Sequence, residues 1–127
     1  YIVAAQPTSI LNTTKKLLGI EAEYTAFDMD VLMHINSTFA TLHQLGVGPI
    51  VPFEIEDEEA VWADFILDTP NINSVKTYMY MKVRLAFDPP STSYGITAME
   101  AQTKEYEWRL EAATTSYTPE TGGDRYG

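Results

Sequence analysis

The sequence contains few side chains that could act as metal ligands or nucleophiles. Its 127 residues include no cysteine, which excludes disulfides, thiolate nucleophiles and cysteine-ligated zinc or iron–sulfur sites. The two histidines, His34 and His43, fall on one expected helix, where their spacing places them on opposite faces. We therefore expect both to be ordinary surface or boundary residues rather than a metal-binding pair.

The acidic residues add little chemistry of their own. Asp28 and Asp30 follow two glutamates, but the spacing lacks the glycine turn and the terminal glutamate of a calcium loop. The contiguous pair Glu58 and Glu59 suits the first turn of a helix, where acids interact favourably with the helix dipole. The sequence therefore predicts neither an enzyme nor a cofactor site.

The charge of the chain is strongly and unevenly negative. Eighteen acids and eight bases give a formal net charge of −10, and no Lys or Arg occurs between Lys16 and Lys76. Binding to a phosphate backbone requires clustered cations that release counterions, so this interval is not expected to bind DNA. The acids are sufficient to keep a small protein in solution.

Residues 73–87 form the helix that the other elements must cover. Apolar side chains recur there at spacings of three and four, and further apolar residues lie elsewhere around the helix. Each large side chain gains roughly 1.5–3 kcal/mol on burial, so other segments must pack on several sides. Asp88, Pro89 and Pro90 end this helix. Its start is either Asn73 or the Thr69-Pro70 pair.

Capping residues and glycines predict three helices before residues 73–87. The first helix runs from a Ser9 cap to Gly19, and a short third helix follows a cap at Asp57. The second begins with a capping box formed by Thr25 and Asp28 and continues for about twenty residues. Tyr24 and Met29 are expected to form its hydrophobic staple, and Gly46 to end it.

A final helix follows the Ser-Thr-Ser cluster at 91–93. Its apolar positions repeat at alternating spacings of three and four, which predicts a seam against one facing helix. The seam consists of Ile96, Met99, Thr103, Tyr106 and Leu110.

The predicted fold is therefore all-α, a small bundle of about four to five helices around residues 73–87. Residues 9–113 form the helical domain, residues 1–8 an extended N-terminal arm and residues 114–127 a C-terminal tail. No stretch approaches the roughly 20 apolar residues that cross a bilayer. We expect a soluble protein with no membrane contact.

Residue types common at protein interfaces are abundant. The chain has eight tyrosines, two tryptophans and five methionines, and the core accounts for part of them. Tyr1, Tyr117 and Tyr126 lie in arms that have no core to join, so we predict that they contact partners.

Four blocks of the sequence share their order and spacing with a known family. They are residues 10–19 with Lys-Lys-Leu-Leu-Gly, 27–49 with His-Ile-Asn-Ser and Leu-Gly-Val-Gly-Pro, 75–90 with Lys-Val-Arg-Leu-Ala-Phe-Asp-Pro-Pro, and 105–110 with Glu-Trp-Arg-Leu. Together, over residues 9–112, they resemble the head–tail connector, or adaptor, proteins of long-tailed bacteriophages.

This resemblance implies a non-enzymatic subunit without a cofactor, assembled in the host cytoplasm into a dodecameric homo-oligomeric ring of the virion neck. The ring would bind the portal protein on one side and a stopper or tail-completion protein on the other, and double-stranded DNA would pass through without specific binding. Family members commonly place a C-terminal segment against the portal. The matching residues here are Thr114, Tyr117, Pro119 and Tyr126.

Two further surfaces follow from the residues themselves. The arm with Tyr1, Ile2 and Val3 has no matched counterpart in the family and is predicted to contact a neighbouring subunit or the tail side. A channel wall benefits from the absence of phosphate-binding cations, so we expect acids of the base-free interval to line it. The lining residues are Glu56, Glu58 and Glu59.

Two other functions remain open from sequence. One is a monomeric acidic regulator that mimics the charge of DNA. The acids of such a protein would be spread evenly along one exposed face, whereas here they cluster in loops and at helix starts. The other is a tail-terminator or stopper subunit, which is usually richer in strands.

Overall fold

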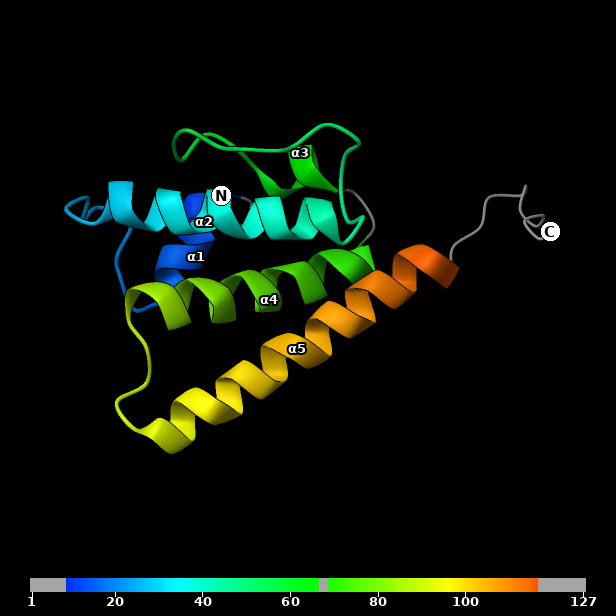
Figure 1. Cartoon of the computed structure of the whole chain (residues 1–127). Coiled ribbons are helices and arrows are strands. Elements are labelled where there is room, and N and C mark those ends of the chain that lie inside the picture. Colours follow the sequence, from blue (N-terminus) through cyan, green and yellow to red (C-terminus); the bar gives the residue numbers. More distant parts are fainter. Residues whose placement is uncertain (1–8, 67–68, 117–127) are drawn as a thin grey trace.

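The computed structural model describes residues 9–66 and 69–116, and within these ranges the chain is all-helical, as predicted (Figure 1). An isolated antiparallel bridge joins Ser9 to Val61. The helices, in chain order, are α1 (Ile10–Leu17), α2 (Asp28–Gln44), α3 (Trp62–Phe65), α4 (Thr69–Phe87) and α5 (Ser93–Ser116).

Helix α4 is the centre of the bundle. It packs against α1, α2 and α5, and Figure 1 shows it lying between α2 and α5. Val75, Tyr78, Met79 and Val83 have no exposed surface. The predicted apolar helix is therefore confirmed. It begins at Thr69, the earlier of the two predicted starts, because proline is accepted in the first turn of a helix.

The start of α2 differs from the prediction. Phe27 is the N-cap residue and no side chain caps it, while Thr25 contributes only its backbone carbonyl, which accepts from the Asp28 amide at 3.1 Å. The Asp28 carboxylate instead pairs with Lys15 of α1. Met29 is 81% exposed, so the predicted staple with Tyr24 is also wrong. The ion pair takes the carboxylate that a capping box would need.

The C-terminal end of α2 follows the prediction more closely. The helix ends at Gln44, and Gly46 then adopts a positive φ of 84°, which favours glycine. The Val47 amide donates to the Leu42 carbonyl at 2.9 Å and closes the turn.

Helix α3 is shorter than predicted and begins later. The Asp57 carboxylate accepts from the Glu59 amide at 2.9 Å, which forms a local turn instead of a helix cap. The helix instead starts at Trp62. The Asp64 carboxylate, in its first turn, accepts from the Val61 amide at 3.1 Å. Trp62 and Phe65 are buried.

Helix α5 lies obliquely across α4 (Figure 1). The Thr92 hydroxyl accepts from the Gly95 amide at 3.0 Å and caps its first turn. Thr103 and Leu110 of the predicted seam are buried, and Ile96, Met99 and Tyr106 are half-buried, so the seam is confirmed. The helix continues to Ser116, beyond the boundary predicted at residue 113.

Candidate interaction surfaces

The segment between α2 and α3 includes an acidic loop, residues 53–60, whose backbone is fixed at several points. The Asn36 side chain clamps the Ile55 peptide, donating to its carbonyl at 3.0 Å and accepting from its amide at 2.9 Å. The Ser9 hydroxyl donates to the Glu58 carbonyl at 2.9 Å, and the Ile10 amide donates to the Ala60 carbonyl at 3.0 Å. The loop is therefore held against both α1 and α2.

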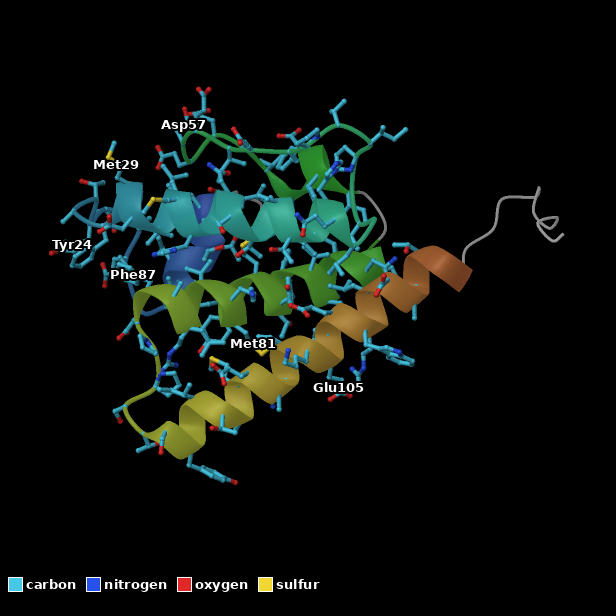
Figure 2. The ribbon with its side chains drawn as sticks, viewed as in Figure 1. Tyr24, Met29, Asp57, Met81, Phe87 and Glu105 are labelled. Atoms are coloured by element: carbon cyan, nitrogen blue, oxygen red, sulfur yellow. The ribbon has the colours of Figure 1, made fainter. Side chains whose placement is uncertain are left out.

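This anchoring leaves the carboxylates of the acidic loop facing outward. Glu56, Glu58 and Glu59, predicted from sequence to line a channel, are all exposed in this one loop. Figure 2 shows Asp57 at the outer edge of the molecule. Residues 9–66 hold ten acids and two bases, whereas residues 69–116 hold five of each. The α1–α3 side of the subunit therefore repels phosphate and attracts cationic surfaces.

Lys15 is the buried base of this acidic side. Its side chain is 1% exposed, and its ammonium group lies 2.7 Å from Asp28 Oδ1. The same group donates to the carbonyls of Ala22 at 3.1 Å and Tyr24 at 2.8 Å. The ammonium group therefore has two hydrogen-bonded carbonyls and one ion-paired carboxylate, and the loop between α1 and α2 is tied to a single point.

The fixed loop forms a concave surface, here called the α1–α2 pocket. It has a volume of about 590 Å³ and is lined by Gly19, Ile20, Glu21, Glu23, Tyr24 and Phe27. The Phe27 ring packs edge-on against Tyr24, with centroids 5.6 Å apart, and against Phe87 of α4 at 5.3 Å. Tyr24 and Phe87 lie together at this end of the bundle (Figure 2). The pocket thus has an aromatic wall and two carboxylates.

A second apolar surface lies on the side of α5 that faces away from α4. Tyr94, in the first turn of the helix, is 83% exposed, and Trp108, in its C-terminal half, is 70% exposed. Lys104 lies one turn before Trp108 and is exposed. The outer face of α5 is defined here as Tyr94, Thr97, Ala101, Glu105 and Trp108, and Lys104 lies at the border between this face and a groove that α5 shares with α2 and α4.

A groove of about 560 Å³ is lined by residues of α2, α4 and α5. Its lining includes His34, Lys82, Lys104 and Glu107. The Tyr78 hydroxyl donates to Glu107 Oε2 at 2.7 Å, and burial, followed by this hydrogen bond and the charge of Glu107, raises the pKa of Tyr78. Tyr78 therefore remains a neutral hydrogen-bond donor that links α4 to α5.

The described residues contain no cluster of three or more His, Asp or Glu side chains suited to a metal ion. None of the helices in the same ranges is long and apolar enough to span a bilayer.

The predicted portal-binding and arm residues fall mostly outside the structure described. Tyr1, Ile2, Val3, Tyr117, Pro119 and Tyr126 lie outside the described residues. Thr114 lies inside α5 instead of in a tail, and its hydroxyl donates to the Glu111 carbonyl at 2.8 Å. Its side chain lies beside Gly46, so the end of α5 reaches the end of α2.

Sequence reasoning missed the roles of Lys15, Phe27 and Trp108. Lys15 lies four residues after the buried Leu11 and therefore on the same helix face, which indicates a buried position. Trp108 sits two residues before Leu110 of the seam, and that spacing turns it away from α4. The spacings of Lys15 from Leu11 and of Trp108 from Leu110 are the sequence features that could have indicated these positions. No spacing of this kind indicates the role of Phe27.

The described residues thus present exposed apolar and acidic surfaces suited to contact with other proteins. Residues 10–117 match the model of the phage connector protein family, and the chain belongs to this family. The protein is thus a bacteriophage head–tail connector, as the sequence resemblance predicted. Searches of curated proteins and of solved structures gave no match.

Proposed function

We propose that this connector assembles as a homo-oligomeric ring in the virion neck, between the portal protein and a stopper or tail-completion protein. The family match over residues 10–117 carries the proposal. The difference in charge between the α1–α3 side and the α4–α5 side supports it, because a ring subunit must present two different surfaces to its neighbours.

The test is reconstitution with the portal protein of the same phage. Native mass spectrometry and negative-stain microscopy should show a ring on one end of the portal, with twelve subunits as the resemblance implies. A subunit that stays unbound at high concentration of both proteins, with helical content intact, would overturn the proposal.

The portal contact is proposed to use residues at the end of α5 and beyond, namely Thr114, Tyr117, Pro119 and Tyr126. Truncation after Ser116 keeps all of α5, whereas truncation after Ala113 removes its last residues. Both variants should fold and both should lose portal binding. Retained binding after truncation at Ser116 would show that residues 117–127 are dispensable. Deletion of residues 1–8, with Tyr1, Ile2 and Val3, should instead weaken contact with a neighbouring subunit or the tail side.

The acidic loop is proposed to face the DNA channel. Lysines at Glu56, Glu58 and Glu59 should slow DNA ejection, because cations in the wall would bind passing phosphates. The matched control replaces the same three residues by glutamine, which removes charge without adding a cation and should leave ejection near the wild-type rate. Equal rates for the lysine and glutamine variants would contradict this role.

A further inference from the structure

We propose that Trp108 on the outer face of α5 of one subunit inserts into the α1–α2 pocket of the next subunit. The contact would join two different surfaces of the same chain. This inference rests on the proposed ring and names the residues that close it.

The pocket has the properties of a preformed receptor for an aromatic side chain. Its wall is formed by Ile20, Tyr24 and Phe27, and Tyr24 is 52% exposed while Phe27 is 40% exposed. Its backbone is fixed because Lys15 binds the carbonyls of Ala22 and Tyr24. A surface that is already ordered loses little conformational entropy on binding, so the contact is favoured.

The outer face of α5 carries the matching group. An indole that is 70% exposed is a large apolar surface for a residue with no role in its own core. Tryptophan is also the residue type most typical of binding hot spots.

Charge selects a second copy of this chain as the occupant. Glu21 and Glu23 line the pocket and are exposed, and Lys104 is exposed one turn from Trp108, while the nearby Glu105 is already paired with Arg109 at 2.6 Å. With Trp108 in the pocket, Lys104 would lie near these two carboxylates. Opposite charges at such a contact fix its register and disfavour the reversed arrangement.

The two surfaces lie on different sides of the subunit. Figure 2 shows Tyr24 at one end of the bundle and Glu105, three residues from Trp108, on the far side of α5. A contact between two such surfaces is heterologous, so each added copy exposes a new pocket and a new Trp108. Repetition closes into a ring when the rotation per subunit permits it.

The first test measures self-association by sedimentation velocity over a range of concentrations. Trp108→Ala should raise the apparent Kd at least tenfold, with helical content unchanged because the side chain is exposed. Tyr94→Ala is the matched control, since it removes an exposed aromatic about 21 Å away on the same helix and should have little effect. An unchanged Kd for Trp108→Ala would overturn the proposal.

Charge exchange tests the register. Lys104→Glu should weaken association, and so should Glu21→Lys with Glu23→Lys. The triple variant should recover most of the wild-type affinity, because the two reversals complement each other across the contact. Failure of the triple variant to recover would remove the proposed pairing.

Cross-linking tests whether the contact is heterologous. The chain has no cysteine, so Ala26→Cys beside the pocket and Ala101→Cys on α5 can be introduced cleanly. A short bismaleimide should give dimers from a mixture of the two single variants and a ladder of larger products from the double variant. Ala63→Cys with Ala101→Cys is the control and should give no ladder. A wild type that remains monomeric, together with no ladder, would overturn the inference.

These outcomes are separable from those of the proposed function. Specific self-association without portal binding would support the Trp108 contact and refute the neck role. Portal binding that survives Trp108→Ala with a normal ring would refute the contact and leave the neck role standing.

Discussion

The ammonium nitrogen of Lys15 and Oδ1 of Asp28 lie 2.7 Å apart and join α1 to the first turn of α2. Lys15 is 1% exposed, whereas Asp28 keeps 27% of its side chain in contact with solvent. The pair therefore combines a buried cation with a partly hydrated anion. Its Lys15 member also binds the loop that forms the α1–α2 pocket, so one side chain serves both folding and the proposed contact.

Lys15→Met should lower the free energy of unfolding by about 3 kcal/mol, because it leaves two loop carbonyls and a carboxylate without their donor. Lys16→Met is the matched control, since Lys16 is exposed in the same turn and should change stability by about 0.5 kcal/mol or less. Urea denaturation at neutral pH measures both. Similar losses for the two variants would contradict the role assigned to Lys15.

Alkaline stability should depend on Tyr78. The pKa of Tyr78 is raised in the folded state, while an unfolded tyrosine ionises near pH ~10. Above that pH the folded chain holds a proton that the unfolded chain has lost, so the free energy of unfolding falls as pH rises. Tyr78→Phe should flatten this decline in urea denaturation above about pH 10, and at neutral pH should cost about 1 kcal/mol. Tyr94→Phe, at an exposed site, should leave the slope unchanged.

Two glycines with positive φ allow the cost of backbone strain alone to be compared with the cost of strain plus steric overlap. Gly19 has a φ of 87° with open space around it, so Gly19→Ala should cost about 1 kcal/mol. Gly48 has a φ of 98°, and a Cβ there would overlap the Phe65 ring, so Gly48→Ala should cost about 3 kcal/mol or more. Thermal unfolding of both variants tests the difference. Equal losses would mean that Phe65 moves aside freely.

The Asn36 clamp should control the order of the acidic loop. Asn36→Ala removes both hydrogen bonds to Ile55 and should speed amide exchange across residues 53–60, with a stability loss of about 1–3 kcal/mol. Ser37→Ala, at the exposed neighbouring position, should leave exchange in the loop unchanged. Hydrogen exchange with mass spectrometry provides the measurement. Unchanged exchange in Asn36→Ala would show that Ser9 and α1 hold the loop without the clamp.

Periodicity predicted the helices well where burial alone decides the structure. The apolar pattern of residues 73–87 indicated a helix covered on several sides, and Val75, Tyr78 and Met79 are fully buried. The alternating spacing of the α5 seam likewise identified Thr103 and Leu110 as its buried positions. Both patterns repeat within one helix, so they can be found without knowing the tertiary fold.

The sequence failed where two segments compete for one side chain. Asp28 fits a capping box by its distance from Thr25, but Lys15 reaches it across a loop that no local rule describes. Asp57 similarly fits a helix cap, yet its carboxylate closes a turn and α3 begins only at Trp62. The shape of the α1–α2 pocket depends on the packing of several elements and could not be derived from local pattern.

Helix α5 has 24 residues, which corresponds to a rod of roughly 36 Å, and it packs chiefly against α4. Mechanical load applied near Trp108 would therefore pass through α5 into α4, the central helix of the bundle, and not into the loops. In the proposed ring, each subunit would contribute one such strut.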